Sequence, residues 1–293
     1  MIDKNLYLID GHACCYKYYF GYEKNPLRNS RGDNTSVCYG MARLLTSLFL
    51  GFDVSHLAVI FDPPNGTWRK RVYPEYKATR TKSVDIRPYI GQAYEMIRAW
   101  QIYTSAFKDF EADDIIALLT KKAVKAGFDV SIITKDKDYA QLVNEHVRLI
   151  DINHSVGKDK EAVTVIDREA VKQKWGVYPE QISDYLSLVG DASDNIKGVP
   201  GIGEKTAALL LNKYSTAENV YTNIKDLSEK QQAKFVSGRD SFLLAKRLVT
   251  MPEEADIKLP LNMDDLKIPE KLNGTILNVL LDLEFKSIID QLR

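Results

Sequence analysis

The segment Leu6-Tyr-Leu-Ile-Asp10 sets a pattern that recurs through the first half of this chain. Its apolar run ends at an aspartate, and the runs His56–Phe61 and Val130–Thr134 are likewise followed by Asp62 and Asp136. Helix-like sequence comes after each aspartate. Buried strands that alternate with helices are typical of a parallel sheet covered on both faces. We therefore predict an α/β fold with a mostly parallel central sheet, and we expect the three aspartates to meet at its carboxyl edge, where ligands bind in such folds.

Two regions depart from this alternation. Residues 64–102 hold a basic, proline-interrupted stretch and then the helical run Ile90–Trp100, which together predict an insertion. From about Asp167 the strand pattern fades, and the rest predicts helices joined by short turns. We predict an α/β domain over residues 1–170 and a smaller helical domain over residues 171–293. Residues 156–161 and 251–265 are predicted to be exposed connectors.

Composition excludes several classes of protein. The 45% hydrophobic and 27% charged content is that of a folded chain, and forty basic residues balance forty acidic ones, so no basic coat covers the whole surface. Three cysteines lack CxxC spacing, four histidines lack zinc-ligand spacing, and no apolar run reaches the ~18 residues of a membrane helix. We therefore predict a cytoplasmic protein that has no disulfide framework, structural zinc or membrane anchor.

Further acids accompany the three strand-end aspartates. They are Glu111, Asp113 and Asp114 at the start of a helix, Asp138, and the pair Asp191 and Asp194. Each acid alone has an ordinary explanation, since acids stabilise helix N-termini. Together they would repel by about 4 kcal/mol per pair at ~4 Å, and the only basic residues in these motifs are Lys135 and Lys137. Oxygen ligands suit hard divalent cations, and two such ions suit phosphodiester hydrolysis, so the set predicts a magnesium centre.

In order and spacing, these segments resemble the 5′-to-3′ exonuclease domain of bacterial DNA polymerase I and free-standing phage and bacterial flap endonucleases. The resemblance covers nearly the whole chain. It rests on Leu8-Ile-Asp10-Gly-His-Ala13, Phe61-Asp62, Thr67-Trp-Arg69, Tyr76-Lys77-Ala-Thr-Arg80, Glu111-Ala-Asp113-Asp114, Asp136-Lys-Asp138, Gly190-Asp191-Ala-Ser-Asp194, and Gly198-Val-Pro-Gly201-Ile-Gly203-Glu-Lys205-Thr206.

The resemblance implies a PIN-like 5′ nuclease fold and a structure-specific nuclease that acts as flap endonuclease and 5′-to-3′ exonuclease. Two Mg²⁺ ions, with Mn²⁺ as the alternative, would support hydrolysis of DNA to 5′-phosphate and 3′-hydroxyl ends in primer removal and repair. By resemblance, one ion would bind Asp10, Asp62, Glu111 and Asp113, and the other would bind Asp113, Asp136, Asp138 and Asp191, with Asp114 and Asp194 as supporting acids.

The insertion is similar to the family's helical arch, in which Lys77 and Arg80 would join Asp113 as catalytic residues at the scissile phosphate. Arg69 would contact DNA and Tyr76 would stack on a base. Taken without the resemblance, the six basic residues between Gly66 and Lys82 are more typical of a solvated helix. The aromatic residues between them and the nearby acids favour DNA.

The glycine-rich turn is similar to a helix-three-turn-helix motif near residues 183–214. Its residues Gly198, Gly201, Gly203, Lys205 and Thr206 would bind duplex phosphates, and carbonyl groups would hold a potassium ion. A Walker nucleotide-binding loop is the poorer interpretation, because Glu204 separates the last glycine from Lys205. A plain glycine-capped turn is the structural alternative.

The expected partners are DNA 5′ flaps, nicks and 5′ ends, with RNA primer ends as further substrates, and the protein is expected to be a monomer. Two other functions fit the sequence: a DNA-junction binding protein with weak or no catalysis, and a ribonuclease with the same acidic rim. Lys135 stands where the family usually has Gly, and Lys197 where it often has Pro. The sequence is compatible with both a free-standing nuclease and an excised polymerase domain.

Overall fold

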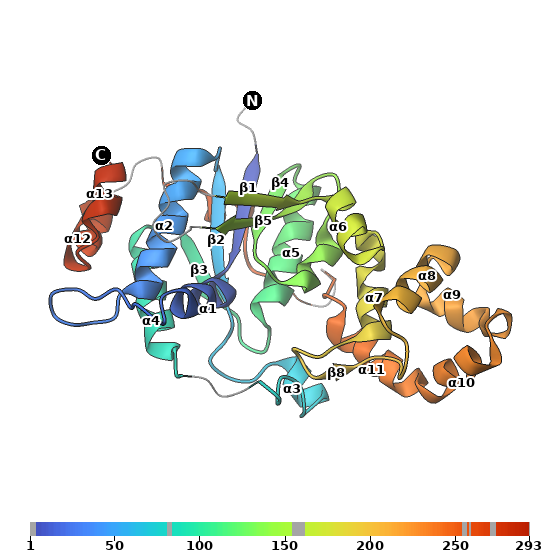
Figure 1. The fold of residues 1–293 in the computed structure, drawn as a ribbon. Helices are drawn as coiled ribbons and strands as arrows, with labels where there is room; N and C mark the ends of the chain where they lie inside the picture. The colour runs from blue at the N-terminus through green and yellow to red at the C-terminus, as the bar shows by residue number, and fades with distance from the viewer. Residues whose placement is uncertain are drawn as a thin grey trace.

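The computed structural model describes residues 4–80, 84–153, 162–253, 257, 259–269 and 274–292 (Figure 1). A six-stranded sheet of order β3-β2-β1-β4-β5-β6 forms its centre, with β1 to β5 parallel and β6 antiparallel to β5. The strands are β1 Asn5–Asp10, β2 His56–Phe61, β3 Tyr103–Ala106, β4 Asp129–Ile133, β5 Val147–Asn153 and β6 Ala162–Ile166. The predicted mostly parallel sheet is confirmed.

Strand β1 lies at the point where the chain changes direction across the sheet. From β1 the chain builds β2 and β3 on one side and then crosses to β4 on the other. In open parallel sheets, ligands bind at the carboxyl ends of the strands that flank such a point. Asp10 ends β1, and Asp136 follows β4, so the two side chains flank this crevice.

The alternation of side chains along β1 explains why both sheet faces are covered. Leu6 and Leu8 are fully buried in a core with α5 (Ala112–Lys125), whereas Tyr7 and Ile9 are buried in a second core with α1 (Gly11–Gly21), α2 (Ser36–Gly51) and α4 (Arg87–Ala99). A strand whose two sets of side chains are both buried has a continuous apolar sequence rather than an alternating one.

The second half of the chain is helical, as predicted. It contains α6 Arg168–Trp175, η2 Pro179–Gln181, α7 Ile182–Val189, α8 Glu204–Tyr214, α9 Ala217–Thr222, η3 Ile224–Asp226, α10 Glu229–Ser237, α11 Arg239–Val249, η4 Met263–Leu266, α12 Gly274–Asp282 and α13 Lys286–Leu292. A two-stranded hairpin, β7 (Gly190–Asp191) with β8 (Ile196–Lys197), interrupts the helices.

This helical part is not independent of the α/β part. Leu186 of α7 and Leu248 of α11 belong to the same buried core as Ile116 of α5 and Tyr139 of η1 (Lys137–Leu142). Because one core spans both parts, the hairpin that follows α7 is held against the carboxyl edge of the sheet. Asp191 and Asp194 on that hairpin therefore have a fixed position relative to the strand-end acids.

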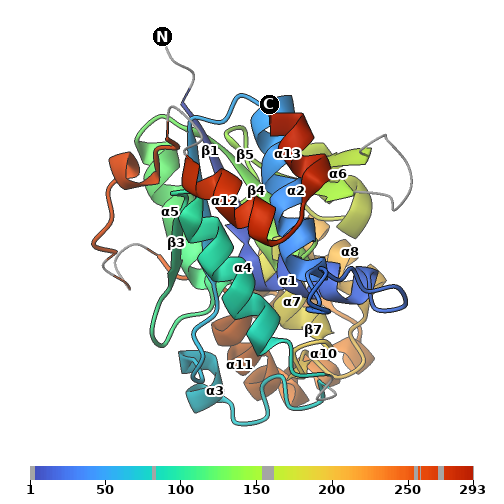
Figure 2. The same ribbon diagram turned by 90° about the vertical axis from the view of Figure 1, so that its left-hand side faces the viewer.

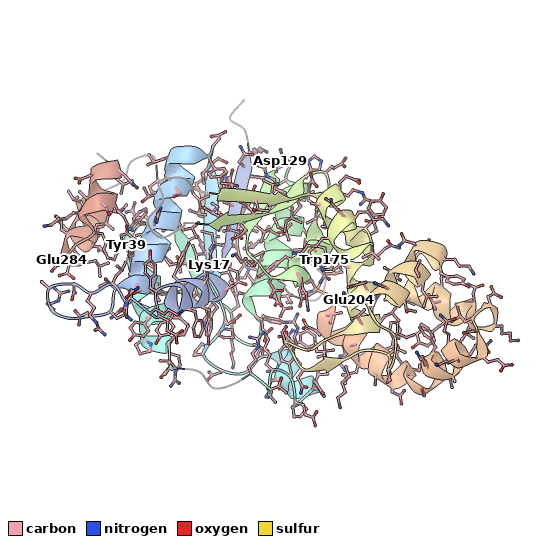
Figure 3. The ribbon with its side chains drawn as sticks, viewed as in Figure 1. Lys17, Tyr39, Asp129, Trp175, Glu204 and Glu284 are labelled. Atoms are coloured by element: carbon pink, nitrogen blue, oxygen red, sulfur yellow. The ribbon has the colours of Figure 1, made fainter. Side chains whose placement is uncertain are left out.

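The last two helices lie elsewhere than predicted. Residues 171–293 were predicted to form one helical domain, but α12 and α13 pack on α4 and α2 of the α/β part (Figure 2). Tyr39 of α2 meets Phe285 edge-on at 5.3 Å, and the Glu284 carboxylate beside it accepts from the Ser30 amide at 3.0 Å (Figure 3). The apolar faces of α12 and α13 thus complete the second core.

Residues 156–161, predicted to be a connector, lie outside the described residues. The second predicted connector, 251–265, is not uniformly exposed, since Met251 and Leu261 are buried against the first core. All three cysteines are buried free thiols. None of the helices in the described part of the chain has the length and apolar character needed to cross a membrane.

Candidate metal centre

The ends of β1 and β2 each present an aspartate that is fixed by a helix start. Asp10 caps α1, where its Oδ1 accepts from the Ala13 amide at 2.9 Å, and its Oδ2 accepts from the Tyr139 hydroxyl at 3.1 Å. Asp62 Oδ1 accepts from the amide of Ala112, the first residue of α5, at 2.8 Å. Burial and the nearby Asp62 charge raise the pKa of Asp10 to about 7.

These aspartates and the start of α5 enclose one cavity. It measures about 100 Å³, and the acids that line it are Asp10, Asp62, Glu111, Asp113 and Asp136. Burial and the neighbouring carboxylates Asp114 and Glu111 raise the pKa of Asp113 well above its usual range, although Arg69 opposes this. The structure thus brings together five of the predicted metal ligands.

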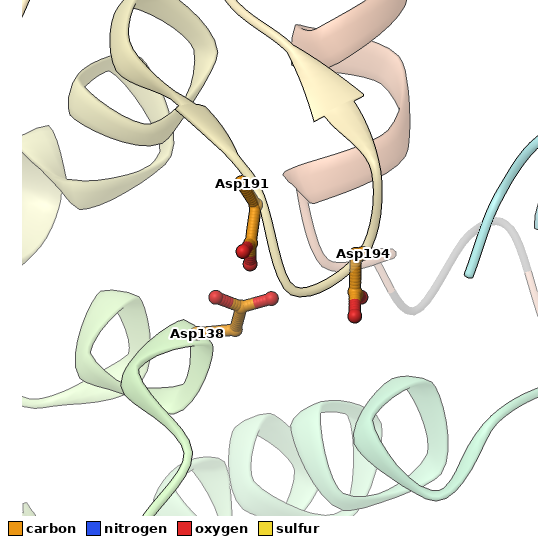
Figure 4. Close-up of side chains that lie close together, drawn as sticks. All are labelled: Asp138, Asp191 and Asp194. Carbon is orange, nitrogen blue, oxygen red and sulfur yellow. The ribbon is translucent and has the colours of Figure 1, made fainter. Parts of the chain in front are cut away.

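A second acidic cluster lies beside the hairpin. Carboxylate oxygens of Asp138, Asp191 and Asp194 lie within 4.8 Å of one another, and the three side chains converge from η1 and the β7–β8 hairpin (Figure 4). Asp138 Oδ1 is buried and has no hydrogen-bond partner among the described residues. Burial and the Asp136 charge raise the pKa of Asp138 well above its usual range.

The unpartnered Oδ1 of Asp138 indicates whether this cluster suits a cation. A buried polar atom that lacks a partner is costly, and three carboxylates whose oxygens lie within 4.8 Å of one another add mutual repulsion. A hard divalent cation, which takes carboxylate oxygens as ligands, would satisfy the Asp138 oxygen and offset that repulsion. Asp191 is already stabilised: burial would raise its pKa, but hydrogen bonds from Ser193 and Lys137 lower it. The donor set therefore fits a divalent metal.

Two basic residues of the insertion reach these acids. Lys77 Nζ lies 2.9 Å from Glu111 Oε2, and Arg80 Nη2 lies 2.5 Å from Asp194 Oδ1. Both side chains line the cavity. Lys77 has a left-handed backbone with φ 55°, and its amide donates to the Asp194 carbonyl at 2.9 Å. The insertion is thereby joined to the hairpin, and both cationic groups are held beside the acids.

Arg69 was predicted to contact DNA, and in this structure it is a buried residue that pairs with acids at the start of α5. The residue is 2% exposed, and its guanidinium pairs with Asp114 at 2.8 Å, Asp113 at 3.2 Å and Glu111 at 3.4 Å, while Nε donates to the Leu248 carbonyl at 2.9 Å. Asp114 is completely buried by this contact. Arg69 is thus a buried counter-ion for the start of α5, and Asp114 supports Arg69 rather than facing the cavity.

Tyr76 was predicted to stack on a base, and in this structure it lies in the core. The residue is 3% exposed, and its hydroxyl oxygen lies 2.8 Å from Glu111 Oε2 and 2.9 Å from Asp194 Oδ2. A ring enclosed in the core offers no face to a base. Its observed role is to link an acid at the start of α5 with an acid of the hairpin.

Replacing Arg69 with methionine is expected to lower the free energy of unfolding by about 3–5 kcal/mol, because it would leave a buried cluster of carboxylates without its counter-ion. Urea unfolding followed by circular dichroism measures this change. Arg71→Met is the matched control, since Arg71 is exposed and pairs with Asp109 on the surface. A loss below about 1 kcal/mol for Arg69→Met, the size of a surface ion pair, would contradict the assignment.

The glycine-rich turn between α7 and α8 is shaped by its glycines. Gly201 has φ +77°, and a Cβ at Gly198 would lie 2.3 Å from the Leu188 carbonyl oxygen, so both positions require glycine for the fold. At Gly203, however, a Cβ would meet no atom within 4 Å. Lys205 is exposed in the first turn of α8, with Thr206 beside it. The turn therefore presents glycine backbone and a lysine to solvent.

Two family models together match most of the chain. The model described as 5′-3′ exonuclease, N-terminal resolvase-like domain, matches residues 5–176, and the model described as 5′-3′ exonuclease, C-terminal SAM fold, matches residues 177–273. The chain belongs to the 5′-3′ exonuclease family. The resemblance inferred from the motifs is confirmed. The two models meet just after Gly176, which ends α6 with φ 74°, whereas the predicted boundary at residue 170 lies inside α6.

Known proteins from bacteria support this membership. The 5′-3′ exonuclease of Aquifex aeolicus is 36% identical over 290 residues, which cover 98% of this chain and 95% of that protein. DNA polymerase I of Bacillus caldotenax is 35% identical over 294 residues, which cover 99% of this chain but 32% of the polymerase. The chain thus spans about a third of the length of the DNA polymerase I relatives it matches.

Solved structures share the fold of this family member. A zinc-bound T5 5′-exonuclease has a TM-score of 0.70 at 19% identity, with 99% of this chain and 100% of that chain covered. Flap endonuclease-1 from Methanococcus jannaschii has a TM-score of 0.62 at 18% identity, with 99% and 92% covered. The α/β architecture with its appended helical region is therefore that of known 5′ nucleases.

Several residues near the centre of this exonuclease-family fold were not predicted. Tyr139 binds Asp10, and Lys137 pairs with Asp191 at 3.0 Å. His12 accepts from the Asp62 amide at 3.0 Å and lines the cavity. The sequence places Lys137 between Asp136 and Asp138, but it does not indicate Asp191 as the ion-pair partner. Lys135, the unusual residue of the family motif, pairs with Asp151 at 3.2 Å.

The raised pKa of Asp10 has a consequence for stability without divalent cations. The folded state holds this proton up to about pH 7, whereas the ordinary pKa of an aspartate is 3.8. The fold therefore loses stability progressively as the pH rises from about 3.8 to about 7. Asp10→Asn should therefore match the native protein in stability near pH 4 and exceed it by up to ~4 kcal/mol near pH 8. Urea unfolding in EDTA at both pH values measures the gap. A gap that narrows with rising pH would contradict the assigned shift.

Proposed function

We propose that this chain is a structure-specific 5′ nuclease that hydrolyses DNA with two divalent cations and leaves 5′-phosphate and 3′-hydroxyl ends. The observation that carries the proposal is the meeting of acids from three strand ends, one helix start and the β7–β8 hairpin, with an unpartnered buried oxygen on Asp138. Carboxylates from both halves of the chain repel one another when they converge, and bound cations would offset that repulsion.

The ligands of each ion are proposed as the resemblance to the family implies them. Asp10, Asp62, Glu111 and Asp113 would hold one ion, and Asp113, Asp136, Asp138 and Asp191 would hold the other, with Asp194 beside the second site and Asp114 supporting through Arg69. When bound, the two ions would activate water and neutralise charge on the departing 3′ oxygen. Mg²⁺ is proposed because carboxylate ligands suit it, and Mn²⁺ shares that ligand preference.

Lys77 and Arg80 are proposed to act on the scissile phosphate. Each now pairs with an acid that would also face a cation, Glu111 for Lys77 and Asp194 for Arg80. Once those acids share their charge with metal, the two basic groups become available to a phosphate in the same cavity. Burial alone would lower the pKa of Lys77, but Glu111 and Asp194 raise it, so this ammonium stays protonated. Both residues can therefore stabilise negative charge on the phosphate.

The turn at 198–203 is proposed to bind duplex phosphates through Gly198, Gly201, Gly203, Lys205 and Thr206, with K⁺ held by backbone carbonyls. The open space at Gly203 supports this, because a phosphate can approach backbone there. The proposed substrates are 5′ flaps, nicks and 5′ ends, including RNA primer ends, in replication and repair. We further propose a monomer in the cytoplasm, where the buried thiols remain reduced.

The experiment compares 5′-labelled flap, nicked, blunt-ended and single-stranded DNA, and a flap that ends in RNA, with Mg²⁺ and with EDTA. We expect cutting near the flap junction with Mg²⁺ and none with EDTA. Tight binding of the flap without cutting would instead identify a junction-binding protein. Preferred cutting of single-stranded RNA would identify a ribonuclease.

A further inference from the structure

The histidine next to the acids is held on two sides. His12 Nδ1 lies 3.0 Å from the amide nitrogen of Asp62, and its ring meets Phe61 edge-on at a centroid distance of 5.7 Å. The amide can only donate, so Nδ1 must accept and therefore carries no proton. In a neutral imidazole, the proton then resides on Nε2. One backbone contact thus fixes which nitrogen of His12 is the donor.

The same hydrogen bond makes the ring neutral. An imidazole whose Nδ1 accepts from the Asp62 amide carries its one proton on Nε2 and has no net charge. A neutral donor suits a site for divalent cations, because a further ammonium or guanidinium at this position would be repelled by the ions.

His12 is one of the residues that line the acidic cavity, together with Asp10, Asp62, Asp113, Lys77 and Arg80. Among the described residues, no group is hydrogen-bonded to Nε2, and Nε2 is not a buried atom. Nε2–H is therefore an accessible donor on a residue of the cavity wall, and an acceptor such as a phosphate oxygen can use it.

We propose that His12 Nε2–H donates a hydrogen bond to a non-bridging oxygen of the phosphate that reacts in this cavity, which makes His12 a catalytic residue alongside Lys77 and Arg80. The inference rests on the proposed nuclease function and deepens it. His12 is the neutral member of the set: Lys77 and Arg80 supply charge, whereas His12 supplies a donor whose direction is fixed by the Asp62 amide.

Replacing His12 with asparagine should keep the hydrogen bond to the Asp62 amide and remove the proposed one to the phosphate. The carbonyl of His12→Asn can still accept from the Asp62 amide, but its shorter side chain cannot present a donor where Nε2 stands. We expect kcat for 5′-flap cleavage to fall on the order of 100-fold, with KM and the melting temperature little changed. His12→Gln, which reaches as far as Nε2, should recover roughly a tenth or more of native kcat. His146→Asn is the matched control, because His146 bonds to Asp129 on the surface.

A second measurement keeps the proposal independent of turnover. In protein labelled with ¹⁵N-histidine, thymidine 5′-monophosphate with Mg²⁺ should shift one side-chain signal, and that signal should be missing from His12→Asn. Native kcat in His12→Asn, or no shift of that signal, would overturn the proposal and leave His12 a structural residue. If the native protein cuts no flap at all, the proposed function fails instead, while the shift still reports on His12 and phosphate.

Discussion

Cleavage of a 5′ flap in Mg²⁺ should fall at least ~1000-fold when Asp138 is replaced by asparagine. An ion in a phosphodiester-cleaving site stabilises the transition state by several kcal/mol, and each 1.4 kcal/mol corresponds to about tenfold in rate. Asp138 belongs to the acidic cluster at the hairpin, and its buried oxygen without a partner would be a ligand there. Single-turnover cleavage of a labelled flap measures the loss, and gel-shift affinity for the same flap should persist.

The same substitution should stabilise the protein without metal. Burial raises the pKa of Asp138, so its ionised form at neutral pH destabilises the fold, and the neutral amide removes that cost. We expect a higher melting temperature in EDTA and a smaller rise on adding Mg²⁺. Asp129→Asn, at the amino end of β4 and on the opposite edge of the sheet (Figure 3), is the matched control. Cleavage within tenfold of native by Asp138→Asn would contradict the assignment.

Lys77→Met and Arg80→Met should each lower single-turnover cleavage about 100- to 1000-fold, the range for removing one donor from developing charge. Duplex affinity should change far less, because both groups line the acidic cavity and pair with acids beside it, Lys77 with Glu111 and Arg80 with Asp194. Single-turnover rates at saturating enzyme, compared with fluorescence anisotropy on the same flap, separate the two effects.

Arg71→Met controls for loss of positive charge in the insertion, since Arg71 pairs with Asp109 outside the cavity. It should weaken binding slightly and leave the saturated rate unchanged. If Lys77→Met and Arg80→Met also weaken binding while saturated rates stay native, both residues serve docking only, and their placement at the reacting phosphate is wrong.

The sheet and its acidic edge were predictable because their causes are local. Apolar runs such as Leu6–Ile9 have the length of buried strands, and parallel strands bring their carboxyl ends to one edge, so Asp10 and Asp62 had to approach each other. The positions of Asp191 and Asp194 beside these acids could not be derived from nearby sequence. They depend on the core that α5 and α7 share, and only the resemblance to known nucleases indicated them.

Arg69 and Tyr76 show why the insertion was harder. Their sequence is basic and aromatic, which is equally typical of a DNA-binding surface and of a buried counter-ion network. The difference lies in contacts made by segments distant in sequence: the Leu248 carbonyl accepts a hydrogen bond from Arg69, and Asp194 accepts one from Tyr76. Likewise, the apolar pattern of α12 predicts a buried face but does not name α4 as its partner.

X-ray diffraction from crystals soaked in Mn²⁺ would observe the ions directly. Anomalous difference maps should show two peaks about 4 Å apart in the acidic cavity, one beside Asp10, Asp62 and Asp113 and the other beside Asp136, Asp138 and Asp191. Maps without a peak among these carboxylates, from crystals that bind Mn²⁺ only elsewhere, would contradict the metal centre and with it the proposed nuclease.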